Sequence, residues 1–193
     1  MKVSDFIWCG TIPNQVVFDH ASQVQLLLMD VDGVVTDGRI YYLPGETDLA
    51  FETKGFASHD GLAFHFLKAM GIKTGFISGR ESQAVEEYAG NKDITFVYQG
   101  KLDKMPILQD VLGTTSLAAG QVAYIGDDFT DVPVFNRVGL ACAVADARAE
   151  VREKAHFVTQ AKGGQGAVRE VVELILKARG DWEKILSQYE LSG

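Results

Sequence analysis

The sequence predicts an α/β protein with a doubly wound, Rossmann-like parallel sheet, because short apolar runs alternate with segments of helical periodicity. The first run, residues 24–29, is apolar through most of its length, as expected of a strand buried on both faces. Later runs end in polar or acidic residues, and right-handed crossovers would place these ends at one edge of the sheet. A chain of 193 residues can bury a full core, so we expect a single domain over residues 1–193.

The remaining elements follow from the same alternation. Apolar residues at helical spacing, followed by Gly71, predict a helix over residues 60–70. We expect further strands over residues 73–77, 94–98, 121–125, 140–144 and 156–159. Helices are expected over residues 81–89, 103–112, 130–138 and 147–154, and a C-terminal helix should end near residue 179.

Three segments lie outside this alternation. Two β-prone aromatic runs surround a turn at Pro44 and Gly45, which predicts a hairpin flap over residues 39–53 and no large cap domain. Residues 1–20 show no clear periodicity and are expected to form an N-terminal extension. Residues 163–193 should form a glycine-rich tail and a helix.

Composition excludes several classes of function. The formal net charge is −8 and no block of Lys or Arg occurs, which argues against nucleic acid or an anionic membrane surface as partner. No apolar stretch approaches the ~20 residues of a membrane span, and the N-terminus lacks the pattern of a signal peptide. Cys9 and Cys142 are too few for a disulfide framework. We therefore expect a cytoplasmic protein.

The expected carboxyl edge of the sheet collects an unusual number of charged side chains. Asp30 and Asp32 follow the first strand, and either could belong to a plain acidic turn. Their expected neighbours make chemistry the better interpretation, since carboxylates there can act as a nucleophile, a general acid or metal ligands. The neighbours, which follow later strands or begin a helix, are Ser78, Arg80, Lys104, Asp127, Asp128 and Asp131.

So many carboxylates would repel one another without a cation. Mg²⁺ suits oxygen ligands of this kind, and the four scattered histidines and two cysteines offer no zinc site. Lys104 and Ser78 supply a positive charge and a hydroxyl donor, which phosphoryl oxygens require. The set therefore predicts phosphoryl transfer by an acidic nucleophile with Mg²⁺.

Taken together, these residues resemble a known family. The ordered motifs are Asp30-x-Asp32-Gly-Val, Ser78-Gly79-Arg80, Lys104 and Gly126-Asp127-Asp128-x-x-Asp131, with the tail Gly163-Gly164-Gln165-Gly166-Ala167-Val168-Arg169-Glu170. They are similar to the motifs of the haloacid dehalogenase superfamily of aspartate-nucleophile phosphohydrolases. Over residues 24–180 the chain resembles the capless branch that contains the 3-deoxy-D-manno-octulosonate 8-phosphate phosphatases.

The resemblance implies a role for each matching residue. Asp30 would attack phosphorus, Asp32 would serve as acid and then base, and Ser78 with Lys104 would hold the phosphoryl group. Mg²⁺ would be held by Asp30, the backbone carbonyl of Asp32 and Asp127, with Asp128 or Asp131 in support. An acidic sugar phosphate would be bound by Arg80 and also by Asp32, Ser58, His59, Asp60, Gly61, Gly79, Lys104 and Arg169. Members of this branch form homotetramers, which the resemblance extends to this chain.

The sugar is the weaker part of this expectation. His59, His65 and Tyr88 stand where the branch usually carries basic residues, while Arg80 favours an eight-carbon octulosonate. One alternative is a phosphatase for nonulosonate (sialic-acid-like) 9-phosphates. Another is a non-catalytic assembly module like those fused to cytidylyltransferases, although the complete set of phosphoryl residues argues against it.

Overall fold

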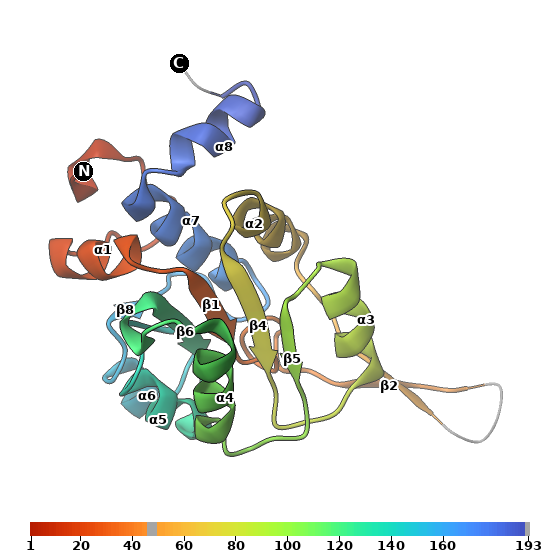
Figure 1. The fold of residues 1–193 in the computed structure, drawn as a ribbon. Coiled ribbons are helices and arrows are strands. Elements are labelled where there is room, and N and C mark those ends of the chain that lie inside the picture. Colours follow the sequence, from red (N-terminus) through yellow and green to blue (C-terminus); the bar gives the residue numbers. More distant parts are fainter. Residues whose placement is uncertain (46–49, 192–193) are drawn as a thin grey trace.

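The structure, a computed structural model, describes residues 1–45 and 50–191. Its main sheet has six strands, all parallel, in the order β5-β4-β1-β6-β7-β8 (Figure 1). The strands are β1 (Leu26–Met29), β4 (Lys73–Ile77), β5 (Phe96–Tyr98), β6 (Val122–Gly126), β7 (Leu140–Ala143) and β8 (Phe157–Val158). The predicted fold class is confirmed, and every residue of β1, β6 and β7 is buried, as a sheet covered on both faces requires.

Helices cover both faces of this sheet. The helices are α1 (Gln15–Ser22), α2 (Ser58–Ala69), α3 (Gln83–Asn91), α4 (Met105–Thr115), α5 (Val132–Phe135), α6 (Ala149–Arg152), α7 (Ala167–Arg179) and α8 (Trp182–Gln188). Helix α7 packs between α1 and α2 on one face, whereas α4 and α5 lie on the other (Figure 1). None of the helices described is long and apolar enough to cross a membrane.

The order of the strands places a topological switch point between β1 and β6. The chain leaves β1 toward β4 and β5, then returns to β6 and continues outward to β7 and β8. Parallel α/β sheets bind their ligands at such a point, outside the carboxyl ends of the strands. Asp30 and Asp127 follow β1 and β6 directly, so the fold places two of the predicted carboxylates there.

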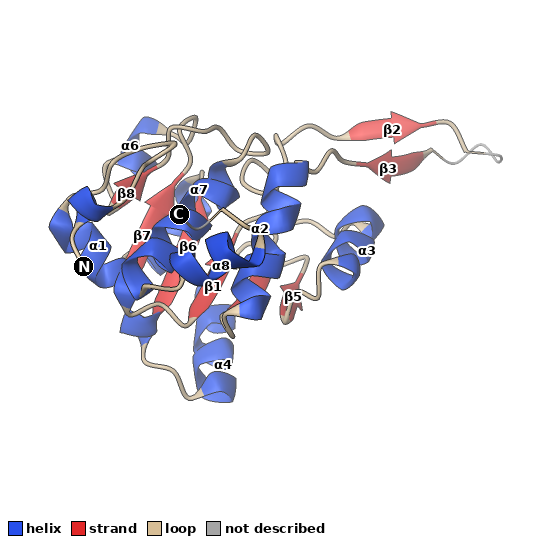
Figure 2. Cartoon of the chain, turned by 90° about the horizontal axis from the view of Figure 1, so that it is seen from above, coloured by secondary structure: helices blue, strands red, loops and turns tan. Residues whose placement is uncertain are grey.

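The flap is a two-stranded hairpin that projects away from the sheet and its helices (Figure 2). Its antiparallel strands are β2 (Tyr41–Leu43) and β3 (Phe51–Thr53), within the predicted limits of 39–53. Part of the predicted connection, residues 46–49, lies outside the described residues. Tyr42 and Phe51 are 63% and 54% exposed, so the hairpin presents aromatic surface to its surroundings.

Some elements differ from the sequence-based expectation. Helix α1 begins within residues 1–20, for which the sequence predicts no secondary structure, and ends at Ser22; the Asn14 side chain accepts a bond from the backbone N–H of Val17, and Phe18 is buried. The helix expected over residues 130–138 is a short 3-10 turn, Phe129–Asp131, followed by α5, which ends at Phe135. Helix α8 follows Gly180, whose positive φ of 78° turns the chain at the end of α7.

The glycine-rich loop before α7 packs against the loop after β1. The backbone N–H of Gly164 donates to the carbonyl of Val34 over 2.9 Å. A Cβ atom on Gly163 would collide with the carbonyl oxygen of Gly33. Two backbones therefore approach here more closely than any side chain would allow.

Candidate active site

The loop after β1 is held against the end of β6. The Asp30 N–H donates to the carbonyl of Ile125 over 2.9 Å, which continues the pairing of the two strands. Gly33 adopts a φ of +89°, and a Cβ atom there would collide with Oδ2 of Asp127. Glycine at this position therefore permits both the turn and the close approach of the Asp127 carboxylate.

Lys104 places a positive charge beside the carboxylates of Asp30 and Asp131. It precedes α4 and is buried, with its Nζ 3.0 Å from Asp30 Oδ2 and 2.6 Å from Asp131 Oδ1. Burial lowers the pKa of Lys104, but the negative charges of Asp30 and Asp131 outweigh it, and the pKa rises overall. The ammonium therefore stays charged beside the proposed nucleophile.

Asp131 supports this arrangement. Its Oδ1 accepts bonds from Lys104 and from the Tyr124 hydroxyl, at 2.6 and 2.8 Å. Its Oδ2 accepts the backbone N–H groups of Asp127 and Asp128, at 2.9 and 3.1 Å. Because each of its carboxylate oxygens accepts two hydrogen bonds, Asp131 orients its neighbours and is poorly placed to coordinate a metal ion directly.

Asp30 and Asp127 belong to a carboxylate cluster that fits a cation, with Asp131 beside them as support. Oxygens of Asp30, Asp127 and Asp131 lie within 4.8 Å of one another, and the buried Oδ1 of Asp127 has no hydrogen-bond partner. Burial, followed by repulsion from Asp30, raises the pKa of Asp127 to about 8. Burial raises the pKa of Asp30 to about 6, partly offset by Lys104. A cation would stabilise the charged form of both carboxylates, and oxygen-only donors favour Mg²⁺.

Asp30, Lys104 and Asp127 line a cavity of about 350 Å³ that opens to solvent. Ser78 lies at the end of β4, and its hydroxyl accepts the backbone N–H of Arg80 over 3.1 Å, so its proton remains available to a ligand. The predicted residues that the cavity brings together are Asp30, Asp32, Ser78, Gly79, Arg80, Lys104, Asp127 and Asp128.

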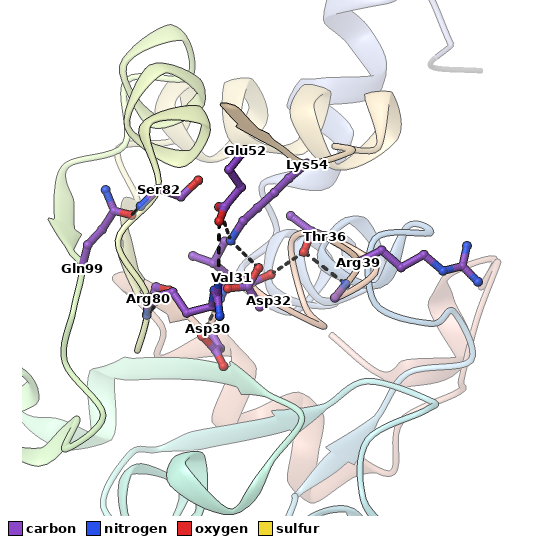
Figure 3. Close-up of polar contacts among 12 residues, drawn as sticks. Asp30, Val31, Asp32, Thr36, Arg39, Glu52, Lys54, Arg80, Ser82 and Gln99 are labelled. Atoms are coloured by element: carbon purple, nitrogen blue, oxygen red, sulfur yellow. Dashed lines mark hydrogen bonds and ion pairs between the residues drawn. The ribbon is translucent and has the colours of Figure 1, made fainter. Parts of the chain in front are cut away.

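The base of the hairpin adds two residues that the sequence-based set omits. Figure 3 shows Glu52 and Lys54 pointing toward Asp32 from β3 and the residue after it. The Lys54 side chain is fully buried, with its Nζ 2.6 Å from Asp32 Oδ1. Glu52 Oε2 lies 3.4 Å from Nη2 of Arg80. The available signal was the motif Lys54-x-Phe56, which also resembles the family, but the direction of the Lys54 side chain depends on how the hairpin leaves the sheet.

Other predicted sugar-binding residues lie elsewhere in the chain. Asp60 is buried and accepts the backbone N–H groups of Gly166 and Arg169, at 3.2 and 2.7 Å. His59 and Arg169 line a second cavity, of about 270 Å³, beside Trp8. Ser58 and Gly61 belong to the first turn of α2. Within this chain these residues do not line the cavity at the switch point, and their role in binding sugar stays a prediction.

The fold and the site together define a class of protein: a phosphohydrolase with carboxylates and a buried lysine at the switch point of a Rossmann-like sheet. The sequence pattern of haloacid dehalogenase-like hydrolases matches residues 77–171. Closely similar relatives cover most of the chain, and the chain belongs to the haloacid dehalogenase-like hydrolase family. The family and the reaction class expected from the motifs are confirmed.

Two curated relatives are each described as a 3-deoxy-D-manno-octulosonate 8-phosphate phosphatase. The protein from Yersinia pestis is 44% identical over 175 residues, which is 90% of either chain. The protein from Escherichia coli K12 is 38% identical over 172 residues and 89% of either chain.

The fold of this chain is also similar to solved structures of phosphatases. A probable YrbI family phosphatase from Pseudomonas syringae has a TM-score of 0.87 at 44% identity, over 91% of this chain and 98% of that one. The 3-deoxy-D-manno-octulosonate 8-phosphate phosphatase from Moraxella catarrhalis has a TM-score of 0.85 at 34% identity, over 90% and 97%. That structure is a complex with a magnesium ion, a phosphate ion and a 3-deoxy-D-manno-octulosonate (KDO) molecule.

Proposed function

We propose that this protein is a Mg²⁺-dependent phosphatase that hydrolyses 3-deoxy-D-manno-octulosonate 8-phosphate. The observation that carries the proposal is the Asp30 carboxylate, held between Lys104 at 3.0 Å and the Asp127 carboxylate at the mouth of a cavity. The choice of sugar is supported by the relatives that carry this activity in their names and by the neighbour that binds Mg²⁺, phosphate and KDO.

The reaction proceeds in two steps on this chain's own residues. An Asp30 carboxylate oxygen attacks phosphorus and the bond from phosphorus to the sugar oxygen breaks, while Asp32 donates a proton to that oxygen. Water then attacks the aspartyl-phosphate and gives its proton to Asp32, which releases phosphate and restores the Asp30 carboxylate. Both steps transfer a phosphoryl group that carries charge on three oxygens.

Two further residues bind that phosphoryl group. Lys104 neutralises its charge, and the Ser78 hydroxyl donates to one of its oxygens. The Val31 N–H donates to Oδ1 of Asp30 over 2.6 Å, so the carboxylate presents a fixed orientation to the phosphorus atom. When bound, Mg²⁺ would be held by Asp30, Asp127 and the backbone carbonyl of Asp32, with Asp128 in support, and it would reduce repulsion between nucleophile and phosphate.

Arg80 would select the acidic sugar. Its guanidinium lines the cavity, and a planar fork of N–H donors matches a carboxylate. The same group distinguishes an octulosonate from neutral sugar phosphates. We also propose that the protein is cytoplasmic and forms a homotetramer. The homotetramer is supported by the exposed aromatic residues of the hairpin, which an assembly would cover.

The test is phosphate release from a panel of acidic and neutral sugar phosphates, with and without Mg²⁺. We expect 3-deoxy-D-manno-octulosonate 8-phosphate to give the highest kcat/KM and a chelator to abolish turnover. Higher kcat/KM with a nonulosonate 9-phosphate would reassign the sugar but retain the reaction. No Mg²⁺-dependent release from any phosphate monoester would overturn the proposed function and favour an assembly module.

A further inference from the structure

Lys54 occupies an unusual position for a lysine. Its side chain is fully buried at the base of the hairpin, although the cavity lined by Asp32 lies close by (Figure 3). Burying an ammonium group is unfavourable unless partners replace its water, and few lysines in folded proteins are buried without such partners. Its partner here is the carboxylate that the proposed mechanism uses as acid and base.

The contact between the two is short and directional. Lys54 Nζ donates to Asp32 Oδ1 over 2.6 Å, as a charge-assisted hydrogen bond. A carboxylate on a freely rotating side chain would sample several orientations, whereas this bond fixes one oxygen and so directs the other. The Asp32 side chain is 21% exposed and lines the cavity, so its second oxygen can reach a ligand.

Glu52 ties this pair to the outer wall of the cavity. Its Oε1 lies 3.7 Å from Lys54 Nζ, and its Oε2 lies 3.4 Å from Arg80 Nη2. Charges therefore alternate from Arg80 through Glu52 and Lys54 to Asp32, as the dashed lines of Figure 3 trace. The outer pair, between Arg80 and Glu52, is exposed at the arginine and contributes little, whereas the Lys54 ammonium, which pairs with Asp32, is buried.

We propose that Lys54 is the positioning residue for Asp32: it orients the carboxylate for proton transfer to the leaving oxygen, and Glu52 holds Lys54 in place. The inference rests on the proposed function, because it assumes that Asp32 protonates the leaving group. Lys54 itself touches no reacting atom. The hairpin thereby contributes to the acid step, while the sheet edge supplies the nucleophile and the phosphate site.

A purely structural ion pair predicts a different result. If Lys54 only anchors the hairpin, its loss should lower kcat/KM equally for every substrate. If it positions the acid, the loss should grow as the leaving group becomes more basic, because good leaving groups depart without a proton. Aryl phosphates from p-nitrophenyl to phenyl phosphate provide such a series, and a sugar phosphate extends it.

The experiment compares Lys54→Met with wild type over this series, using kcat/KM because it reports the first, phosphoryl-transferring step. We expect a loss of about 10²–10³-fold for the sugar phosphate and below about fivefold for p-nitrophenyl phosphate. Lys54→Arg keeps a charged donor and should recover part of the loss. Equal losses across the series, or none, would overturn the proposal.

Lys68→Met is the matched control. Lys68 forms a pair of similar length, 2.7 Å, with Asp93 on the exposed surface, and neither residue lines the catalytic cavity. Its kcat/KM values should equal those of wild type for every substrate. Should Lys54→Met fail to fold, Glu52→Gln removes only the charge that holds Lys54 and should give a smaller loss with the same dependence on leaving group.

Failure of this inference is distinct from failure of the proposed function. The aryl phosphates test Lys54 even if the preferred sugar differs from an octulosonate. Wild-type turnover that lacks any need for Mg²⁺ or Asp30 would contradict the function, whereas a leaving-group dependence that is the same in wild type and Lys54→Met would contradict only the role of Lys54.

Discussion

Two buried lysines reach the same site from different parts of the molecule. Lys104 precedes α4 and contacts Asp30 and Asp131 within the body of the protein. Lys54 enters from the hairpin base and contacts Asp32. The first lies among groups held by the sheet, and the second depends on a segment that projects beyond it (Figure 2). The groups proposed for phosphate binding and for acid catalysis are therefore supported by different parts of the fold.

The most severe test of the residues at the edge of the sheet is Asp30→Asn. We expect kcat to fall by ~10⁴-fold or more, because an amide cannot form the phosphoryl intermediate. The midpoint of thermal unfolding should change little, since Lys104 keeps its shorter pair with Asp131 and the substitution removes one of several mutually repelling charges. Phosphate release and a melting curve of the same preparation check both. Turnover close to wild type would show that another group is the nucleophile.

Asp131→Asn should mainly affect stability. Asp131 is fully buried and pairs with Lys104, so removing its charge leaves an ammonium with one carboxylate fewer. We expect a loss of about 3–5 kcal/mol in the free energy of unfolding, as for breaking a buried pair. Urea denaturation measures it. Tyr124→Phe, which removes only one bond to the same oxygen, is the control and should cost about 1 kcal/mol.

Asp60→Ala tests a residue that lies outside both the sheet edge and the hairpin, at the start of α7. The Asp60 carboxylate accepts two backbone N–H groups at the start of α7, and its loss leaves both without an acceptor. We expect the free energy of unfolding to fall by about 1–3 kcal/mol. Asp60→Asn retains one acceptor and should lose less. A large rise in KM with unchanged stability would instead favour the sugar-binding role predicted from sequence.

The smallest effect on chain stability is expected at the hairpin. Tyr42→Ser replaces an exposed side chain, so the free energy of unfolding of the isolated chain should change by less than about 0.5 kcal/mol. The proposed tetramer should dissociate more readily, because the substitution removes apolar surface that an interface would bury. Light scattering after size-exclusion chromatography measures the mass. An unchanged assembly would place the interface elsewhere.

The residues at the edge of the sheet were predictable because their positions follow from local sequence patterns. A buried strand fixes where Asp30 lies, and the parallel order then brings Asp127 beside it. The position of Lys104 before α4 follows from the same alternation. These residues needed no knowledge of how distant segments pack.

The remainder depends on tertiary contacts that spacing does not encode. The direction of Lys54 depends on how the hairpin leaves the sheet. Helix α1 shows no clear pattern because its eight residues are stabilised by packing against α7. Asp60 was predicted to bind the sugar, yet in this structure both of its carboxylate oxygens accept backbone N–H groups at the start of α7.

The contact between the glycine-rich loop and the loop after β1 has a consequence for reading sequence variation. Gly163 and Gly164 lie far along the chain from Asp30, and a variant there would ordinarily be judged a tolerated change in a surface loop. Any side chain at Gly163 must displace the backbone at Gly33, the glycine that admits Asp127. Such a variant would behave in a genetic screen as an active-site lesion, although its position in the sequence gives no warning.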